Sequence, residues 1–222
     1  PQNPKTPPLS HLKFIMVETS DSKILVGNPG TVRGHRMSLA VCGARKVYAV
    51  RDNLVFSSGK AEDNFVYTGS RDLITAVACW EDKRVAFGDE KGQVKILKQA
   101  EGGAWELDKE HFGVPGQVNE LIWIDDKGLI VLGAGASALK VESGSRMGDI
   151  LGHTGKILCG FHANKVLITA GEGQEIMRHE GPQFKGQGHQ ISHPHTGFVN
   201  QIRVSPDKTK FATASSDKSI AV

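Results

Sequence analysis

One pattern of short apolar runs and turns recurs four times along the chain, and this repeat constrains the fold more than any other feature. Each copy contains three apolar runs, which are separated by turns rich in Asp, Lys and Gly. Such runs between turn residues are typical of β-strands. The copies begin near residues 74, 118, 157 and 199, so their starts are 44, 39 and 42 residues apart. A period of about 40–45 residues with several strands per repeat is typical of the blade of a β-propeller.

A propeller blade is a four-stranded antiparallel sheet that cannot bury both faces alone, so neighbouring blades stack around a central axis. A more divergent unit, with apolar runs from residue 39 to residue 56, precedes the four repeats. We therefore predict an all-β, WD40-type β-propeller at residues 31–222, with blades that start near residues 39, 74, 118, 157 and 199. About five blades are expected, the last of them truncated, as part of a ring of about seven. Residues 1–30 are expected to form an N-terminal extension that contains a candidate closing strand.

Three polar residues are expected to order the turns of the blades. His153, preceded by Gly152, and His195 lie directly before two innermost strands, where WD repeats place a Gly-His pair. Such an imidazole hydrogen-bonds within its own blade. Asp217, like Asp89, lies in a turn between second and third strands, where a carboxylate caps backbone N–H groups. A structural role is predicted for His153, His195 and Asp217, and catalysis at either histidine is a remote alternative.

The chain contains three cysteines, Cys42, Cys79 and Cys159, an odd number at wide spacing. Cys79 and Cys159 lie inside apolar runs, which favours buried free thiols in a reduced compartment. A disulfide framework or a zinc site would need cysteine pairs at close spacing. The N-terminus is polar and Pro-rich, unlike a signal peptide. These features predict a cytoplasmic protein without disulfides.

The three tryptophans are expected to have different roles. Trp80 and Trp123 end innermost runs and are predicted to lie in the core, whereas Trp105 lies in a Gly-rich, charged connection and is a candidate exposed anchor. The formal net charge of +3 argues neither for nucleic acid nor for an anionic membrane as a partner.

The sequence contains no recognisable catalytic or cofactor motif. His189, His193 and His195, with His179 nearby, are a candidate metal site, but a solvated loop is favoured because no Cys or carboxylate joins them. The two Gly-x-Gly segments that begin at residues 133 and 171 are interpreted as turns, because neither is followed by a phosphate-binding helix. We therefore predict that the protein is not an enzyme and holds no cofactor or metal.

Two longer motifs are more specific than the repeat itself, and three shorter ones accompany them. Residues 180–185 read Glu-Gly-Pro-Gln-Phe-Lys, and residues 195–207 contain Phe-Val-Asn-Gln-Ile-Arg-Val-Ser-Pro-Asp. The shorter motifs lie at residues 31–34, 86–96 and 121–135. Together they resemble the N-terminal propeller of the actin-interacting protein 1 family, the WD-repeat partners of cofilin. The resemblance implies a non-catalytic cytoskeletal scaffold that binds actin and a cofilin-like protein and promotes disassembly of cofilin-decorated actin filaments.

The same resemblance implies that Glu172, Phe184 and Phe198 bind partners, although both phenylalanines fit equally well as core residues between blades. Ala134 stands where the family has a Glu, and Gly186 stands where it has a Phe. These departures motivate an alternative function, a WD40 structural subunit of another assembly, such as an axonemal, trafficking or ribonucleoprotein complex. No nucleic-acid or membrane partner is expected.

Overall fold

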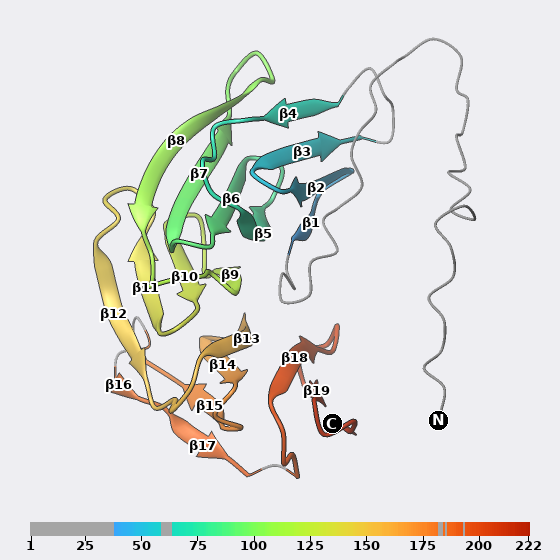
Figure 1. Ribbon diagram of the computed structural model, residues 1–222, viewed down its shortest axis with the longest axis vertical. Helices are drawn as coiled ribbons and strands as arrows, with labels where there is room; N and C mark the ends of the chain where they lie inside the picture. Colours follow the sequence, from blue (N-terminus) through green and yellow to red (C-terminus); the bar gives the residue numbers. More distant parts are fainter. Residues whose placement is uncertain (1–37, 59–63, 182–183, 185, 193) are drawn as a thin grey trace, which may run out of the picture.

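The computed structural model describes residues 38–58, 64–181, 184, 186–192 and 194–222, and the expectations for residues 1–34 lie outside this part (Figure 1). Within it, twenty strands form five sheets. The first sheet contains β1 (Leu39–Cys42), β2 (Arg45–Val50), β3 (Asn53–Ser57) and β4 (Phe65–Tyr67). The second contains β5 (Ile74–Trp80), β6 (Arg84–Asp89), β7 (Gln93–Gln99) and β8 (Trp105–Phe112).

The other three sheets follow the same order of strands. The third contains β9 (Glu120–Trp123), β10 (Gly128–Leu132), β11 (Ala136–Lys140) and β12 (Arg146–Leu151), with the short strand β16 (Gly186–Gln187) at its edge. The fourth contains β13 (Ile157–Ala163), β14 (Val166–Gly171), β15 (Ile176–His179) and β17 (His189–Ile191). The fifth contains β18 (Val199–Val204), β19 (Phe211–Ser215) and β20 (Ile220–Ala221).

The five sheets follow one another along an arc, with the first strand of each sheet facing the centre (Figure 1). Neighbouring inner strands contact one another around this centre. Consecutive strands of each sheet pair antiparallel, which gives each sheet the up-and-down order of a propeller blade. The predicted all-β, WD40-type propeller fold is therefore confirmed.

A repeated backbone hydrogen bond connects each of the first three sheets to the next. The N–H of Ile74 donates to the carbonyl of Arg51 at 2.8 Å, and the N–H of Ile157 donates to the carbonyl of Gly133 at 2.8 Å. Val118 donates in the same way to Asp89 at 3.0 Å. In each case the donor lies at or just before the start of the inner strand of one sheet. The acceptor lies in or next to the turn between the second and third strands of the preceding sheet. These bonds hold adjacent sheets in register.

Carboxylates close the turns between strands. Oδ1 of Asp89 accepts hydrogen bonds from the N–H groups of Lys91 and Gln93, each at 2.9 Å. Oδ1 of Asp125 accepts from the N–H of Lys127 at 2.8 Å. Because each carboxylate satisfies backbone donors that the sheet leaves unpaired, the Asp-rich turns of the repeat are stable without further partners.

The apolar faces of neighbouring sheets form four separate cores rather than one. A cluster between the first and second sheets includes Phe56, Val77, Phe87 and Trp105, and one between the second and third includes Ile96, Val118 and Trp123. The third and fourth sheets share a cluster that includes Ile130, Leu132, Ile157 and Phe184, and the last two share one that includes Ile168, Val199 and Ile202. Each sheet is therefore stabilised mainly by its neighbours, as expected for stacked repeats.

The prediction that Trp105 is an exposed anchor is wrong. Trp105 begins β8 and is only 7% exposed. Its ring stacks on Phe56 of β3, with the ring centroids 4.7 Å apart. The charged residues around Trp105 belong to the outermost strand of the second sheet, and the neighbouring sheet covers one face of that strand at Trp105. Charged neighbours in the sequence therefore did not mean that Trp105 itself is exposed. Trp123 is 8% exposed, in agreement with its predicted core position.

The prediction that all cysteines are free is also wrong. Cys42 of β1 and Cys79 of β5 form a disulfide, with Cα atoms 5.6 Å apart. They are separated by 37 residues in sequence, but both lie on inner strands of neighbouring sheets. The wide spacing in sequence indicated no disulfide, but the stacking of the first two sheets brings their inner strands, and with them the two cysteines, side by side. Cys159 is a buried cysteine outside this disulfide, as predicted.

The chain between β15 and β17 crosses from the fourth sheet to the third. Its strand β16 pairs parallel with β12, and Gly186 lies opposite Ile150. Phe184, just before β16, enters the cluster between these two sheets and is 4% exposed. The insertion therefore joins two blades through both backbone pairing and side-chain packing. In the part of the chain that the structure describes, no helix is long and apolar enough to cross a membrane.

Candidate interaction surface

The connections between strands lie along two opposite edges of the arc. One edge carries the turns between second and third strands and the connections that lead from one sheet to the next, and it includes Glu172 and Phe198. We call it the Glu172 edge. The opposite edge carries the turns between first and second strands and the connections between third and fourth strands, and it includes Phe184. We call it the Phe184 edge.

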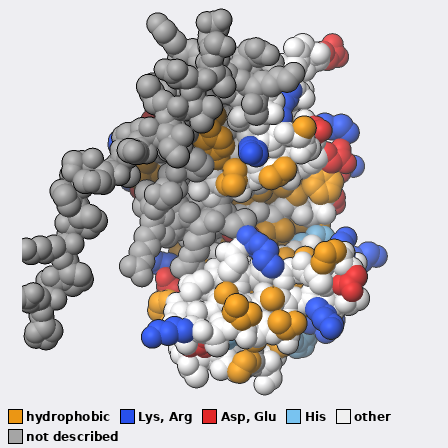
Figure 2. All heavy atoms as spheres, turned by 90° about the vertical axis from the view of Figure 1, so that its right-hand side faces the viewer, with side chains coloured by type: hydrophobic (Ala, Val, Ile, Leu, Met, Phe, Trp, Pro, Cys, Tyr) orange, Lys and Arg blue, Asp and Glu red, His pale blue; other side chains and the backbone are white. Residues whose placement is uncertain are grey.

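Glu172 and Phe198 lie in neighbouring sheets at the Glu172 edge. Glu172 directly follows β14, Phe198 directly precedes β18, and these two strands contact each other. Phe198 is 46% exposed, and Glu172 is partly exposed. Ile220 of the fifth sheet and Val222, directly after β20, are also exposed apolar side chains. Figure 2 shows hydrophobic side chains across the lower part of the molecule, where the fifth sheet lies.

The same kind of backbone hydrogen bond holds both residues, with Glu172 as the donor in the fourth sheet and Phe198 as the acceptor in the fifth. The N–H of Glu172 donates to the carbonyl of Lys156 at 2.9 Å, and the N–H of Ser216 donates to the carbonyl of Phe198 at 2.8 Å. Each bond joins a turn to the connection that enters the same sheet. A side chain at Gly171 would collide with the carbonyl of Lys156, so this position keeps the two connections in close contact. These contacts fix the backbone of the Glu172 edge at both residues.

The other two positions singled out by the resemblance lie apart. Ala134 is exposed in the turn between β10 and β11, on the Glu172 edge, and contributes no carboxylate there. Phe184 lies on the Phe184 edge, where its ring meets His162 edge-on with centroids 5.4 Å apart. The structure thus brings Glu172 and Phe198 to one edge and places Phe184 in the core of the other.

The fifth sheet contains a hydrogen-bonded cluster around His195, which is 6% exposed. Nε2 of His195 lies 2.7 Å from Oγ1 of Thr213, and Nδ1 lies 3.1 Å from Oδ2 of Asp217. Asp217 also accepts hydrogen bonds from Ser219 and from the N–H of Thr196. These bonds, that of the Ser219 hydroxyl above all, hold the pKa of Asp217 well below its usual range. The cluster orders the turn that presents Phe198.

The fourth sheet contains a related but altered cluster. Nε2 of His153 lies 2.7 Å from Oγ1 of Thr169, which lies 3.0 Å from Nε2 of His179. Burial lowers the pKa of His179 to about 4, and the nearby His153 and His189 add to this effect. Burial also lowers the pKa of His153, against the opposing charge of Glu175. Both imidazoles are therefore neutral near pH 7.

Among the residues that the structure describes, no group of three His, Cys, Asp or Glu side chains is placed to hold a metal ion. His179 points into the buried cluster with Thr169, whereas His189 is exposed on β17. His193 lies outside the described residues.

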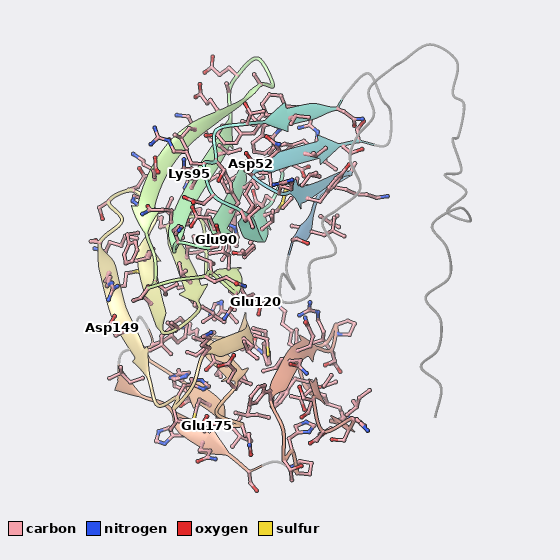
Figure 3. The ribbon with its side chains drawn as sticks, in the orientation of Figure 1. Asp52, Glu90, Lys95, Glu120, Asp149 and Glu175 are labelled. Atoms are coloured by element: carbon pink, nitrogen blue, oxygen red, sulfur yellow. A yellow bond between two sulfur atoms is a disulfide. The ribbon has the colours of Figure 1, made fainter. Side chains whose placement is uncertain are left out.

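Glu120, on inner strand β9, is a buried carboxyl that was not predicted from the sequence. It is 3% exposed and lies near the centre of the arc (Figure 3). Oε2 accepts a hydrogen bond from the N–H of Gly160 at 2.7 Å, and Oε1 lies 4.0 Å from Nη1 of Arg203. Glu120 thus links three successive inner strands. The sequence signal was a Glu inside an otherwise apolar inner run.

Burial raises the pKa of Glu120 to about 7, although the Gly160 N–H and the Arg203 charge both lower it. The folded state therefore binds a proton more tightly than the unfolded state, whose carboxyl has its ordinary value of 4.5. The stabilisation is fully present below pH 4.5 and is lost as the pH rises through 7. Its size is about 3 kcal/mol, at about 1.4 kcal/mol for each pKa unit.

We expect the substitution Glu120→Gln to remove this pH dependence, because the amide oxygen still accepts the Gly160 N–H but carries no charge. Buried His179 acts in the opposite direction, since its stabilisation is lost as the pH falls from 6.5 to about 4. The measurement is therefore the difference in the free energy of unfolding between wild type and variant, from urea titrations between pH 4 and 8. It should shift steadily in favour of the variant as the pH rises. A constant difference would contradict the prediction.

The sequence was compared with known proteins. No family model matches the chain. Actin-interacting protein 1-2 of Arabidopsis thaliana is 27% identical over 193 residues, which cover 74% of this chain and 31% of the relative. WD repeat-containing protein 1 of Gallus gallus is 32% identical over 147 residues, which cover 62% of this chain and 24% of the relative.

A third relative, the 66 kDa stress protein of Physarum polycephalum, is 34% identical over 142 residues, which cover 60% of this chain and 23% of the relative. The chain spans less than a third of the length of each of these relatives. They establish distant homology to a family of WD-repeat proteins and confirm the resemblance that the motifs indicated.

Proposed function

We propose that this distant homologue of the actin-interacting protein 1 family is a non-catalytic scaffold that binds actin together with a cofilin-like protein. In this function it promotes the disassembly of cofilin-decorated actin filaments. The observation that carries the proposal is the alignment of 74% of the chain with a relative whose name describes it as actin-interacting. Glu172 and Phe198, on one edge of neighbouring sheets, are the residues we assign to the interface.

The Glu172 edge has the chemistry of a protein-binding surface. Phe198 is a partly exposed aromatic side chain, the type that most often supplies binding energy in protein interfaces. Exposed cations lie along the same edge, in connections of successive sheets: Arg51, Arg71, Lys91, Lys156 and Lys218. The carboxylates of this edge are less exposed, and that of Asp217 is used to cap its turn. A partner with acidic and apolar groups on a broad surface suits this arrangement.

We expect the double substitution Phe198→Ala and Glu172→Gln to weaken binding to cofilin-decorated filaments by about 2 kcal/mol, or roughly thirtyfold. Both side chains are exposed enough to be removed without disturbing a core. Co-sedimentation with actin filaments, with and without cofilin, measures the affinity. Leu107→Ala is a matched control, because Leu107 is 44% exposed but lies on the outermost strand β8.

The proposal fails if the wild-type protein neither sediments with filaments nor accelerates their disassembly when cofilin is present. The exposed Ala134, where the resembling family has a Glu, favours the second candidate, a structural subunit of another multiprotein assembly. Recovery of a stable large complex without actin, in a pull-down from cell extract, would favour that candidate.

A further inference from the structure

A groove with a volume of about 960 Å³ opens between the third and fourth sheets on the Phe184 edge. Residues that line it come from the turns and adjoining strand ends of the β9–β10, β11–β12 and β13–β14 pairs, together with Gly181 and Phe184. The groove lies at the opposite edge from Glu172 and Phe198, so what it binds is independent of the function proposed above.

The floor of the groove is apolar. Ile124 and Met147 of the third sheet are partly buried against the same cluster as Phe184. His162 of the fourth sheet also lines the groove, and its ring lies edge-on to that of Phe184. Burial lowers the pKa of His162, so its imidazole is neutral at pH 7 and adds no charge to the floor. An apolar side chain that enters this groove would be removed from water.

The rim of the groove is positively charged. Lys127 and Lys165 line it from two turns and Lys140 from the end of β11, and all three are exposed. Within the described ranges, none of these three ammonium groups lies within ion-pair distance of a carboxylate.

Two carboxylates also line the groove, but both have other partners. Asp125 accepts the N–H of Lys127 at 2.8 Å. Glu142 lies 3.4 Å from Arg84 and 3.5 Å from Lys109, which come from the second sheet. Glu142 is therefore paired with cations and Asp125 only with a backbone N–H, so three lysines against one unpaired carboxylate leave the rim with a net positive charge, which favours an anionic ligand.

We propose that this groove binds a short extended segment of a partner protein in which large apolar side chains are flanked by acidic residues. The apolar side chains occupy the floor formed by Ile124, Met147 and Phe184, and the carboxylates face the lysines of the rim. The volume lies at the upper end of the range for ligand pockets, about 300–1,000 Å³, which suits several residues of a peptide. A buried anchor surrounded by charge is a common form of peptide recognition.

The test uses a fluorescein-labelled hexapeptide with two acidic residues on each side of a Leu-Phe pair. Fluorescence anisotropy should show saturable binding to the full chain that weakens as salt is added. The double substitution Lys127→Glu and Lys140→Glu should weaken binding by about tenfold or more, because two attractive contacts become repulsive. Lys83→Glu is the matched control, since Lys83 occupies the corresponding turn of the second sheet and does not line the groove.

Two further peptides separate the parts of the proposal. Replacement of the acidic residues by their amides, or of Leu-Phe by Ser-Ser, should each weaken binding by about tenfold or more. Thermal melting checks that the Lys127→Glu and Lys140→Glu protein is folded. The proposal is overturned if the hexapeptide does not bind, if the Ser-Ser peptide binds equally well, or if Lys83→Glu has the same effect as the double substitution.

Discussion

Replacement of Phe184 by Ala is expected to lower the free energy of unfolding by about 3–5 kcal/mol, the usual range for loss of a buried Phe ring. The ring is 4% exposed and fills the core between the third and fourth sheets. Its backbone φ is 53°, a conformation that is unfavourable for a residue with a side chain. Burial of the ring offsets this strain. Without the ring, the segment directly before β16 also loses its packing in this core.

Urea titration of the full chain measures this effect. Phe184→Leu should be less destabilising than Phe184→Ala, because it keeps most of the apolar volume. Phe198→Ala is the matched control, since Phe198 is 46% exposed and its loss should change the stability by about 0.5 kcal/mol or less. Equal effects of the alanine substitutions at Phe184 and Phe198 would contradict the assignment of Phe184 to the core.

Removal of the disulfide is expected to lower the free energy of unfolding by roughly 3–4 kcal/mol, because it closes a long loop in the unfolded chain. Cys42 and Cys79 are 37 residues apart in sequence and join the inner strands of the first two sheets. Without the bond, these sheets depend on their shared apolar cluster and on the Ile74–Arg51 backbone hydrogen bond.

The double substitution Cys42→Ser and Cys79→Ser tests this expectation in urea titrations with and without dithiothreitol. Dithiothreitol should destabilise the wild type to about the level of the double variant. It should leave the variant unchanged, because Cys159 is buried and forms no disulfide. A wild type that is insensitive to dithiothreitol, with the stability of the variant, would show that the bond contributes nothing.

Much of the fold could be predicted from the sequence. Runs such as residues 74–80 and 157–163, with turn residues between them, identify strands, and their spacing identifies blades. The short outer strand β17 and the parallel strand β16 could not be predicted in this way. Their segment is polar and rich in Gly and His, and its strands form because the edges of β15 and β12 offer backbone partners.

The candidate site could be predicted only in part. The motif around Phe198 indicated an aromatic residue before an inner strand, and the structure places it, partly exposed, on the same edge as Glu172. The motif around Phe184 indicated an aromatic residue equally well, but could not distinguish a contact residue from a core residue. The groove beside Phe184 has no motif, because its lining residues come from separate strand ends and connections of two sheets.

The sequence by itself determined the blades, their order and the polar turns, because strand periodicity and turn chemistry are local properties of the chain. Only the tertiary structure decided which side chains meet between blades. The Cys42–Cys79 bond, the burial of Trp105 and Phe184, and the contact of Glu120 with Gly160 and Arg203 all join different sheets. Such contacts depend on how one blade stacks on the next, and no spacing within a single repeat specifies that arrangement.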